Sequence, residues 1–254
     1  MNNVRTVSDT KRAFYSTHTR PINSIYRRVV EELMVEMHLL SVNANFSYNP
    51  IYALGVVTSF DRFMLGYRPQ EDLGSIFPAL CGSIGADPQH YRHDAQQVIA
   101  SAEAVSLERL TAFARSDDNL DDAGLLGDAL RHVAGDEQFK YSRLWAIGLY
   151  TVIETIDSET AEDAGKLQPV LEPLCDRLGI TFEKLQKDLD IYRSNLEKLE
   201  QARIVMEDIL QADRKKREER QAAKATTTEP NAQAKSDEDG GDPATESQDA
   251  EAQT

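Results

Sequence analysis

Several features that mark membrane proteins and secreted proteins are scarce or missing in this chain of 254 residues. It has two cysteines and one tryptophan, and no apolar run approaches the roughly eighteen residues that a membrane-spanning helix needs. Its start lacks the apolar segment of a secretory signal and the long Ser- and Arg-rich stretch of a transit peptide. Cys81 and Cys175 lie far apart, which favours two small core residues in a reducing compartment. We therefore expect an intracellular protein, soluble or peripheral to a membrane, with no signal peptide and no transmembrane segment.

The motifs that usually carry catalysis are also missing. There is no glycine-rich phosphate loop, no dinucleotide fingerprint and no His-Glu-x-x-His sequence. A di-iron helical bundle needs Glu-x-x-His pairs, and none of the five histidines has a glutamate three residues before it. His90 and His93 share a helix face but lack a third ligand, which favours two surface residues. We expect no enzyme, no catalytic residues, no metal and no cofactor.

Charge is unevenly distributed along the chain, whose formal net charge is −15. Residues 225–254 carry eight acidic residues and one basic residue, without an aromatic residue or a Val, Ile, Leu or Met. Such a segment cannot bury enough apolar surface to offset its ordering entropy, so we predict a disordered acidic tail. The first thirty residues carry +5, and the remaining body is strongly acidic, which argues against a nucleic-acid partner.

Helical periodicity runs through the rest of the chain, and no strand pattern competes with it. The sequence predicts an all-α protein with a basic, largely irregular N-terminal segment over 1–19 and a single compact multi-helix bundle over 20–180. A long helix over 181–224 and the tail over 225–254 complete the chain. Pro78 interrupts the third helical pattern and predicts a kink or a split there. The expected bundle helices cover about 21–40, 50–66, 70–84, 88–102, 106–113, 125–135, 139–156 and 167–178, with room for a helical turn in the polar connection 157–166.

The long C-terminal helix is the strongest single pattern. Apolar residues recur in alternating steps of three and four, interrupted by one arginine, in the series Phe182, Leu185, Leu189, Tyr192, Leu196, Leu199, Arg203, Met206, Leu210. A stripe of this kind needs a partner along its length, which gives the helix coiled-coil character. Periodicity leaves three partners open, namely the protein's own bundle, a second copy of the chain and another protein.

Three stretches together resemble the thylakoid formation protein family, also called photosystem II biogenesis proteins, of cyanobacteria and chloroplasts. They are 5–15 with 20–40, 46–67 (Phe-Ser-Tyr-Asn-Pro-Ile-Tyr-Ala-Leu-Gly at its start) and 139–150 (Phe-Lys-Tyr-Ser-Arg-Leu-Trp-Ala-Ile-Gly-Leu-Tyr). The resemblance covers about residues 1–215, and the lack of a transit peptide indicates a cyanobacterial member. It implies an all-helical, non-enzymatic accessory factor in thylakoid biogenesis and in assembly or repair of photosystem II. It also implies association with FtsH-type membrane proteases and with photosystem II assembly or repair components, on the cytoplasmic side of the thylakoid membrane.

Two surfaces are candidate contact sites. We expect the partner-binding surface on the long helix, at Tyr192, Leu196, Leu199, Arg203, Met206 and Leu210, with packing on the protein's own bundle up to about Leu199. We expect a subsidiary contact with anionic thylakoid lipid or an acidic partner in the basic N-terminal segment, at Arg5, Lys11, Arg12 and Arg20. The alternative function is a small-molecule or pigment-binding bundle, suggested by the aromatic residues Tyr141, Trp145 and Tyr150, although core packing explains these residues as well.

Overall fold

The computed structural model describes residues 5–226, and every regular element in this range is helical. The predicted tail over 225–254 lies outside the described residues beyond Thr226. The chain divides into two compact units, Met1–Val205 and Met206–Thr254, which are described separately below. Within the described range the α-helices are α1 (Val7–Thr17), α2 (Ser24–Ser41), α3 (Pro50–Phe63), α4 (Leu73–Ser83), α5 (Pro88–Glu103), α6 (Leu107–Ala114), α7 (Gly124–Gly135), α8 (Arg143–Ile156), α9 (Ser158–Glu162), α10 (Ala164–Leu178) and α11 (Phe182–Thr226), with a 3-10 turn η1 (Gln70–Asp72) before α4. The predicted all-α class is confirmed for this part of the chain.

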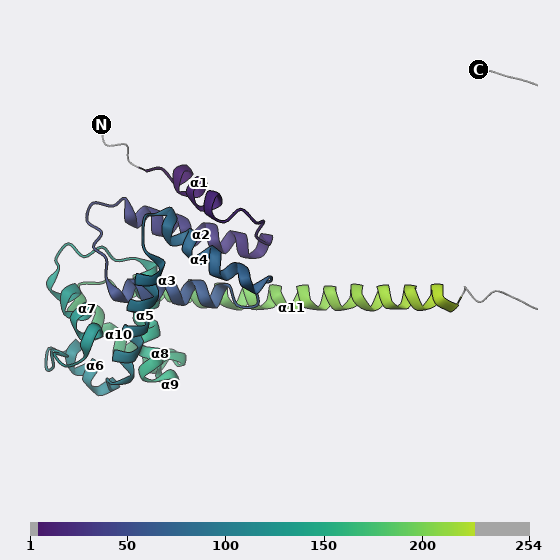
Figure 1. The fold of residues 1–254 in the computed structure, drawn as a ribbon. Coiled ribbons are helices and arrows are strands. Elements are labelled where there is room, and N and C mark those ends of the chain that lie inside the picture. Colours follow the sequence, from purple (N-terminus) through teal and green to yellow (C-terminus); the bar gives the residue numbers. More distant parts are fainter. Residues whose placement is uncertain (1–4, 227–254) are drawn as a thin grey trace, which may run out of the picture. The chain divides into compact units, whose positions relative to one another are not determined.

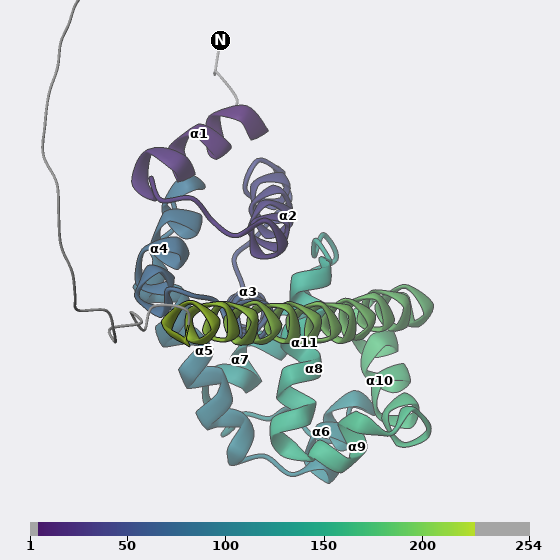
Figure 2. The same cartoon turned by 90° about the vertical axis from the view of Figure 1, so that its right-hand side faces the viewer.

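Helix α3 forms the centre of the first unit. It is buried from Ile51 through Phe60, so the apolar circumference predicted for this segment is present. It packs along α8, which is buried from Leu144 through Ile153, and also contacts α2, α5 and α7. Figures 1 and 2 place α1, α2 and α4 on one side of α3 and the helices α6, α8, α9 and α10 on the other. Two groups of helices thus share one central helix.

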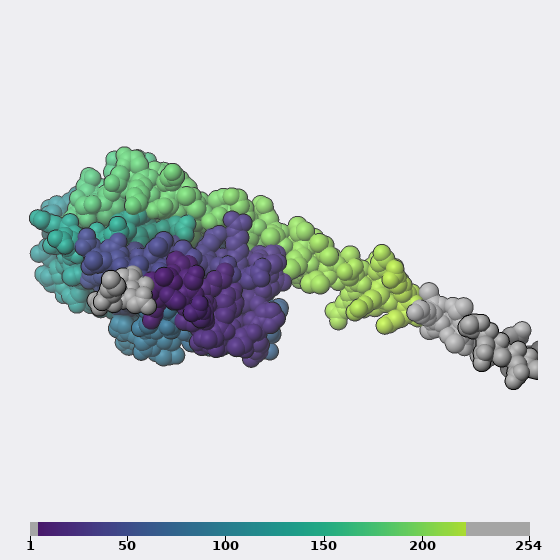
Figure 3. Space-filling model, turned by 90° about the horizontal axis from the view of Figure 1, so that it is seen from above, coloured from purple at the N-terminus to yellow at the C-terminus, as the bar shows by residue number. Residues whose placement is uncertain are grey.

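Residues 7–17 correct the prediction of a largely irregular N-terminal segment. They form α1, which starts with a capping box in which the Thr6 hydroxyl accepts from the Asp9 backbone N–H and the Asp9 carboxylate accepts from the Thr6 N–H. Phe14 is fully buried, and α1 packs against α2 and α4. In Figure 3 the dark purple atoms of α1 lie against the lighter purple atoms of α2. The first helix therefore belongs to the bundle. The prediction of irregular structure overlooked the Thr-x-x-Asp capping sequence at Thr6 and Asp9.

Two further predictions are refined by the structure. Helix α4 runs through Pro78 as one element from Leu73 to Ser83, so the predicted split does not occur. The helix predicted from 139 begins only at Arg143, because the Ser142 side chain caps it by accepting from the Trp145 backbone N–H. The polar connection contains the expected helical turn as α9, whose N-cap is Asp157.

The start of α11 is core rather than surface. Leu185, Leu189 and Tyr192 are each at most 2 % exposed. The stripe is therefore covered by the protein's own bundle over its first turns, as expected. Burial then falls along the helix, and Leu196 and Leu199 are only partly buried.

Candidate functional site: the C-terminal helix and two neighbouring surfaces

Three bundle helices hold the last buried turn of α11. The Tyr192 ring packs edge-on against Phe63 of α3, with ring centroids 5.6 Å apart, and its hydroxyl accepts from the Arg62 guanidinium at 3.4 Å. Arg62 also pairs with Glu154 of α8. Burial raises the pKa of Tyr192 to about 12, so its hydroxyl is protonated at neutral pH. One turn of α11 is thus tied to both central helices by a ring contact and a shared arginine.

Arg193 adds a third attachment to the same turn. Its guanidinium donates to the Ala161 carbonyl of α9 at 2.8 Å and lies over the Tyr150 ring of α8, 4.8 Å from the centroid. Nearer the start of α11, the Tyr141 hydroxyl donates to Asp188 at 2.8 Å. The direction of α11 within the first unit is therefore fixed by polar bonds as well as by burial.

The predicted contact residues on α11 fall into three environments. Tyr192 is 2 % exposed and contacts only the protein's own side chains, so it cannot reach a partner unless the bundle opens. Leu196, Leu199 and Arg203 are partly buried in the first unit, and Arg203 pairs with Glu200. In the second unit, Met206 is partly buried and Leu210 is 62 % exposed. The surface available on the predicted stripe therefore begins near Leu196.

Exposed apolar residues beside the stripe were missed by the heptad analysis. Ile204 and Val205 in the first unit are 50 % and 57 % exposed, and Ile209 in the second unit is 57 % exposed. A heptad search assigns only the a and d positions to an interface, so residues on the flanks are read as solvent-facing. Adjacent β-branched residues on an exposed helix were the signal, because single exposed apolar residues are common but a local group is not.

The four predicted N-terminal contact residues each have an interaction within the first unit. Arg5 donates to the Ser83 carbonyl at 2.8 Å, and Arg20 pairs with Asp72, whose carboxylate is buried. The charge of Lys11 is met by Glu31 at 3.0 Å, and that of Arg12 more loosely by Asp9 at 3.7 Å. The contacts of Arg5, Lys11 and Arg20 join the N-terminal segment to the rest of the bundle, whereas the Arg12–Asp9 pair lies within α1. Lipid binding at these positions stays a prediction, and it must compete with ion pairs already formed.

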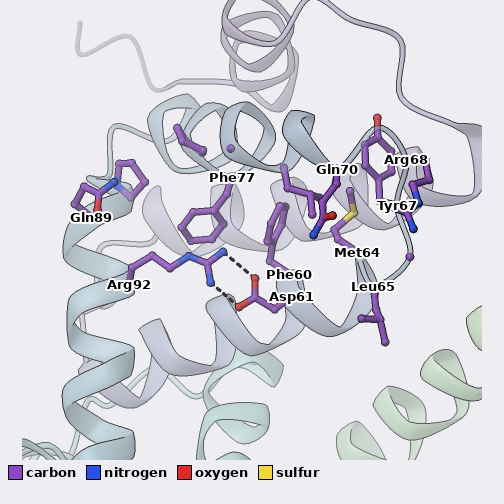
Figure 4. Close-up of a pocket in the computed structure, with 15 residues that line it drawn as sticks. Phe60, Asp61, Met64, Leu65, Tyr67, Arg68, Gln70, Phe77, Gln89 and Arg92 are labelled. Carbon is purple, nitrogen blue, oxygen red and sulfur yellow. Dashed lines mark hydrogen bonds and ion pairs between the residues drawn. The ribbon is translucent and has the colours of Figure 1, made fainter.

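A groove opens between α3, α4 and α5 (Figure 4). Its volume is about 450 Å³, a size typical of small-ligand pockets. Phe60, Met64 and Phe77 supply apolar lining, and Arg92 lies over the Phe77 ring at 4.3 Å. The same guanidinium donates to the Asp61 carboxylate at 2.8 Å, so its charge is largely neutralised. The groove therefore has an apolar floor and a polar edge formed by the Arg92–Asp61 pair.

The structure shows the surroundings of His90, one of the two histidines that share a helix face, and of the two cysteines. His90 stacks on Tyr48, and over residues 5–226 no group of three or more His, Cys, Asp or Glu side chains could hold a metal ion. Both cysteines are free and fully buried, and burial raises the pKa of Cys81 and of Cys175 to about 12. Both thiols act as core residues, as predicted from their isolation in the sequence.

None of the described helices is both long enough and apolar enough to cross a bilayer. The long helix α11 is the obvious candidate by length alone, but its composition is charged throughout its second half.

Comparison with known proteins agrees with the resemblance found in the sequence. The family described as "Thylakoid formation protein" matches residues 6–221. The protein named Thf1 of Nostoc punctiforme is 56 % identical over 220 residues, which is 87 % of this chain and 94 % of the relative. Thf1 of Rippkaea orientalis is 52 % identical over 230 residues, covering 90 % of this chain and 98 % of the relative. A solved structure of Psb29 has a TM-score of 0.71 and 42 % identity, covering 84 % of this chain and 98 % of that chain.

Proposed function

Because the chain belongs to the thylakoid formation protein family, we propose that it is an accessory factor in thylakoid formation and in assembly or repair of photosystem II. We further propose that it acts as a binding protein rather than an enzyme, at the cytoplasmic face of the thylakoid membrane. The names of the relatives and of the Psb29 structure support the general role.

The proposed partner is an FtsH-type membrane protease, together with components of photosystem II assembly or repair. One observation carries the choice of surface: α11 is held in the bundle up to Tyr192 and then exposes Ile204 and Val205. A rigidly rooted helix with an exposed apolar group suits helix-in-groove or coiled-coil recognition. Leu196, Leu199 and Arg203 border this group, and Met206 and Leu210 continue the predicted stripe in the second unit.

Co-purification from solubilised thylakoid membranes tests this proposal. The chain carrying Ile204→Glu and Val205→Glu should lose the protease, because two charges would have to be desolvated in the interface. Both residues are at least half exposed, so the fold should be unaffected. A matched control replaces Leu39 and Val42, which are also exposed but lie at the end of α2, with glutamate.

The control variant should retain the protease and the same photosystem II components as the unchanged chain. If both double variants keep the protease, the exposed pair Ile204 and Val205 is not its binding surface. The sedimentation-equilibrium mass of each variant distinguishes a second copy of the chain as the occupant, because loss of a dimer would accompany the helix substitutions alone.

The alternative of small-molecule binding is better supported by the groove than by the predicted aromatic residues. Trp145 is 1 % exposed and packs on Phe139, and Tyr141 and Tyr150 contact Asp188 and Arg193, so core packing accounts for all three. The groove in Figure 4 is open and apolar at its floor. Protein purified from its native membrane system should absorb above the protein band if the ligand is a pigment. A colourless preparation would exclude the pigment.

A further inference from the structure

In the second unit, one side of α11 carries two apolar residues followed by three basic residues. Successive residues of an α-helix are rotated by about 100°, so residues three, four and seven apart share a side. From Ile209 to Arg220, one side of α11 about 120° wide contains Ile209, Leu210, Asp213, Lys216, Arg217 and Arg220. We call this set the basic-apolar face.

Acidic residues are concentrated on the opposite side of the helix. Glu218 and Glu219 fall there within the segment, Glu207 and Asp208 fall there in the turn just before it, and Lys215 is the one basic residue among them. The basic-apolar face therefore has a net charge of +2, while the opposite side is acidic. Basic and acidic residues in this part of α11 therefore lie on different sides of the helix and not in different stretches of the sequence.

All side chains of the basic-apolar face are exposed to solvent. Ile209 and Leu210 are 57 % and 62 % exposed, and Leu210 borders a shallow depression whose other walls are Asp213, Arg214, Lys216, Arg217 and Arg220. Within the described residues, the ion pair recorded for this segment joins Arg214 to Glu218 at 3.9 Å. The guanidinium and ammonium groups of Lys216, Arg217 and Arg220 thus lie open to an external partner, in contrast with Arg5, Lys11 and Arg20 in the first unit.

We propose that the basic-apolar face binds the surface of an anionic lipid bilayer, with the acidic side turned toward water. Basic side chains near such a surface are attracted by its negative potential, and apolar side chains beside them can enter the headgroup boundary. Ile209 and Arg220 are about 16 Å apart along the helix axis, so the whole face can lie on one patch of headgroups. A net charge of −15 on the chain makes a general attraction to anionic lipid unfavourable, so the contact has to be local.

Charge complementarity favours lipid over a second copy of the chain. Two copies in parallel through this face would bring the basic groups of one against those of the other, which is destabilising. An antiparallel pair would place Lys216 and Arg217 against Ile209 and Leu210, leaving the charges without opposite partners. An anionic bilayer satisfies the basic and the apolar part together. This inference goes beyond the proposed function, because it requires lipid and no protease.

Vesicle flotation of the full-length protein tests the proposal. The protein should float with vesicles of phosphatidylglycerol and phosphatidylcholine but not with phosphatidylcholine alone, and binding should weaken as salt rises. Replacing Arg217 with glutamate should lower the affinity at least about fivefold. The matched control is Lys215→Glu, which makes the same change in charge two residues away but on the acidic side, and it should have a much smaller effect.

Two further variants complete the design. Ile209→Ser with Leu210→Ser should weaken binding in a way that high salt does not reproduce, because it removes apolar insertion rather than charge. Changing Lys11 and Arg12 to glutamate should leave flotation largely unchanged. No flotation of the unchanged chain, or equal losses with Arg217→Glu and Lys215→Glu, would overturn the proposal. Loss of a protein partner by Arg217→Glu without any vesicle binding would assign this face to a protein instead.

Discussion

Gly55 of α3 and Gly148 of α8 lie face to face at the closest approach of the two central helices. A β-carbon at Gly55 would lie 2.9 Å from the backbone nitrogen of Gly148, and one at Gly148 would lie 3.0 Å from that of Gly55. Each would also fall on a carbonyl oxygen of the other helix, at Leu144 and Ile51 respectively. The two backbones are in contact here, which only glycine permits.

Substitution of Gly148 by alanine should therefore be strongly destabilising. The clash is with backbone atoms, so the helices must separate, and the loss should reach or exceed the ~1–3 kcal/mol usual for overpacking. Gly82→Ala is the control, because a β-carbon there meets no other atom within 4 Å. It should be neutral or stabilising by up to about 1 kcal/mol through helix propensity. Denaturant unfolding measures both, and a small effect of Gly148→Ala would show that α3 and α8 can separate at little cost.

Removing the Phe14 side chain should test whether α1 is an integral part of the bundle. Phe14 is fully buried, so Phe14→Ala should cost about 3–5 kcal/mol or release α1. Limited proteolysis would detect release as a new cut between α1 and α2. Arg12→Ala, on the exposed side of the same helix, should change neither stability nor proteolysis. Equal behaviour of the two variants would mean that α1 is not held by its buried face.

The buried thiols should make the protein less stable in alkali. The pKa of Cys81 and of Cys175 is raised by burial from 9.0 to about 12, so above pH 9 the unfolded chain loses protons that the folded chain retains. These groups therefore leave stability nearly unchanged up to about pH 8, and stability falls as the pH rises through 9 toward 12, by about 1 kcal/mol per thiol between pH 8 and 10.

Urea unfolding at pH 8 and pH 10 measures this dependence. The double variant Cys81→Ala, Cys175→Ala should be less stable at pH 8, because it leaves two cavities, but should lose less on going to pH 10. Buried tyrosines also contribute to the alkaline loss, since the pKa of Tyr91 and of Tyr192 is raised to about 12. An identical pH dependence in the variant and the unchanged chain would contradict the role of the thiols.

Arg62 and Glu154 should be energetically coupled at the root of α11. Both side chains are about one-third exposed or less, and Arg62 also donates to Tyr192. A double-mutant cycle with Arg62→Met and Glu154→Gln should give a coupling energy of about 0.5–2 kcal/mol. The exposed pair Arg28 and Glu32 on α2 is the comparison, with an expected coupling below about 0.5 kcal/mol. Equal couplings would mean that the buried root of α11 depends on apolar packing alone.

The sequence was sufficient for features that depend on local pattern. Periodicity predicted the helices from Ser24 onward, including the long helix, because apolar faces and caps such as Asn49 before Pro50 act within a few residues. It also predicted that the stripe on α11 starts against the bundle. α1 was missed because its buried face rests on Thr10 and Phe14, too few residues for a periodic signal.

The structure was needed for features that depend on distant residues. No local rule indicates that Arg20 pairs with Asp72 or Arg5 with a carbonyl near the end of α4, yet these contacts decide how much charge the N-terminal segment offers to lipid. Tyr192 belonged by spacing to the candidate surface and by packing to the core. The basic-apolar face could have been found by plotting residues 209–220 on a helix, but only the structure shows that its side chains are exposed and that Lys216, Arg217 and Arg220 lie open to solvent.

The attachment of α11 to the bundle has a mechanical meaning. Within the first unit, the turn that holds Tyr192 and Arg193 receives a contact from each of α3, α8 and α9. A pulling force applied to α11 from its C-terminal side would have to break these contacts before the buried turns at Leu185 and Leu189 could leave the core. A load from a moving partner would therefore be shared among three helices, and the bundle would resist extraction as one body.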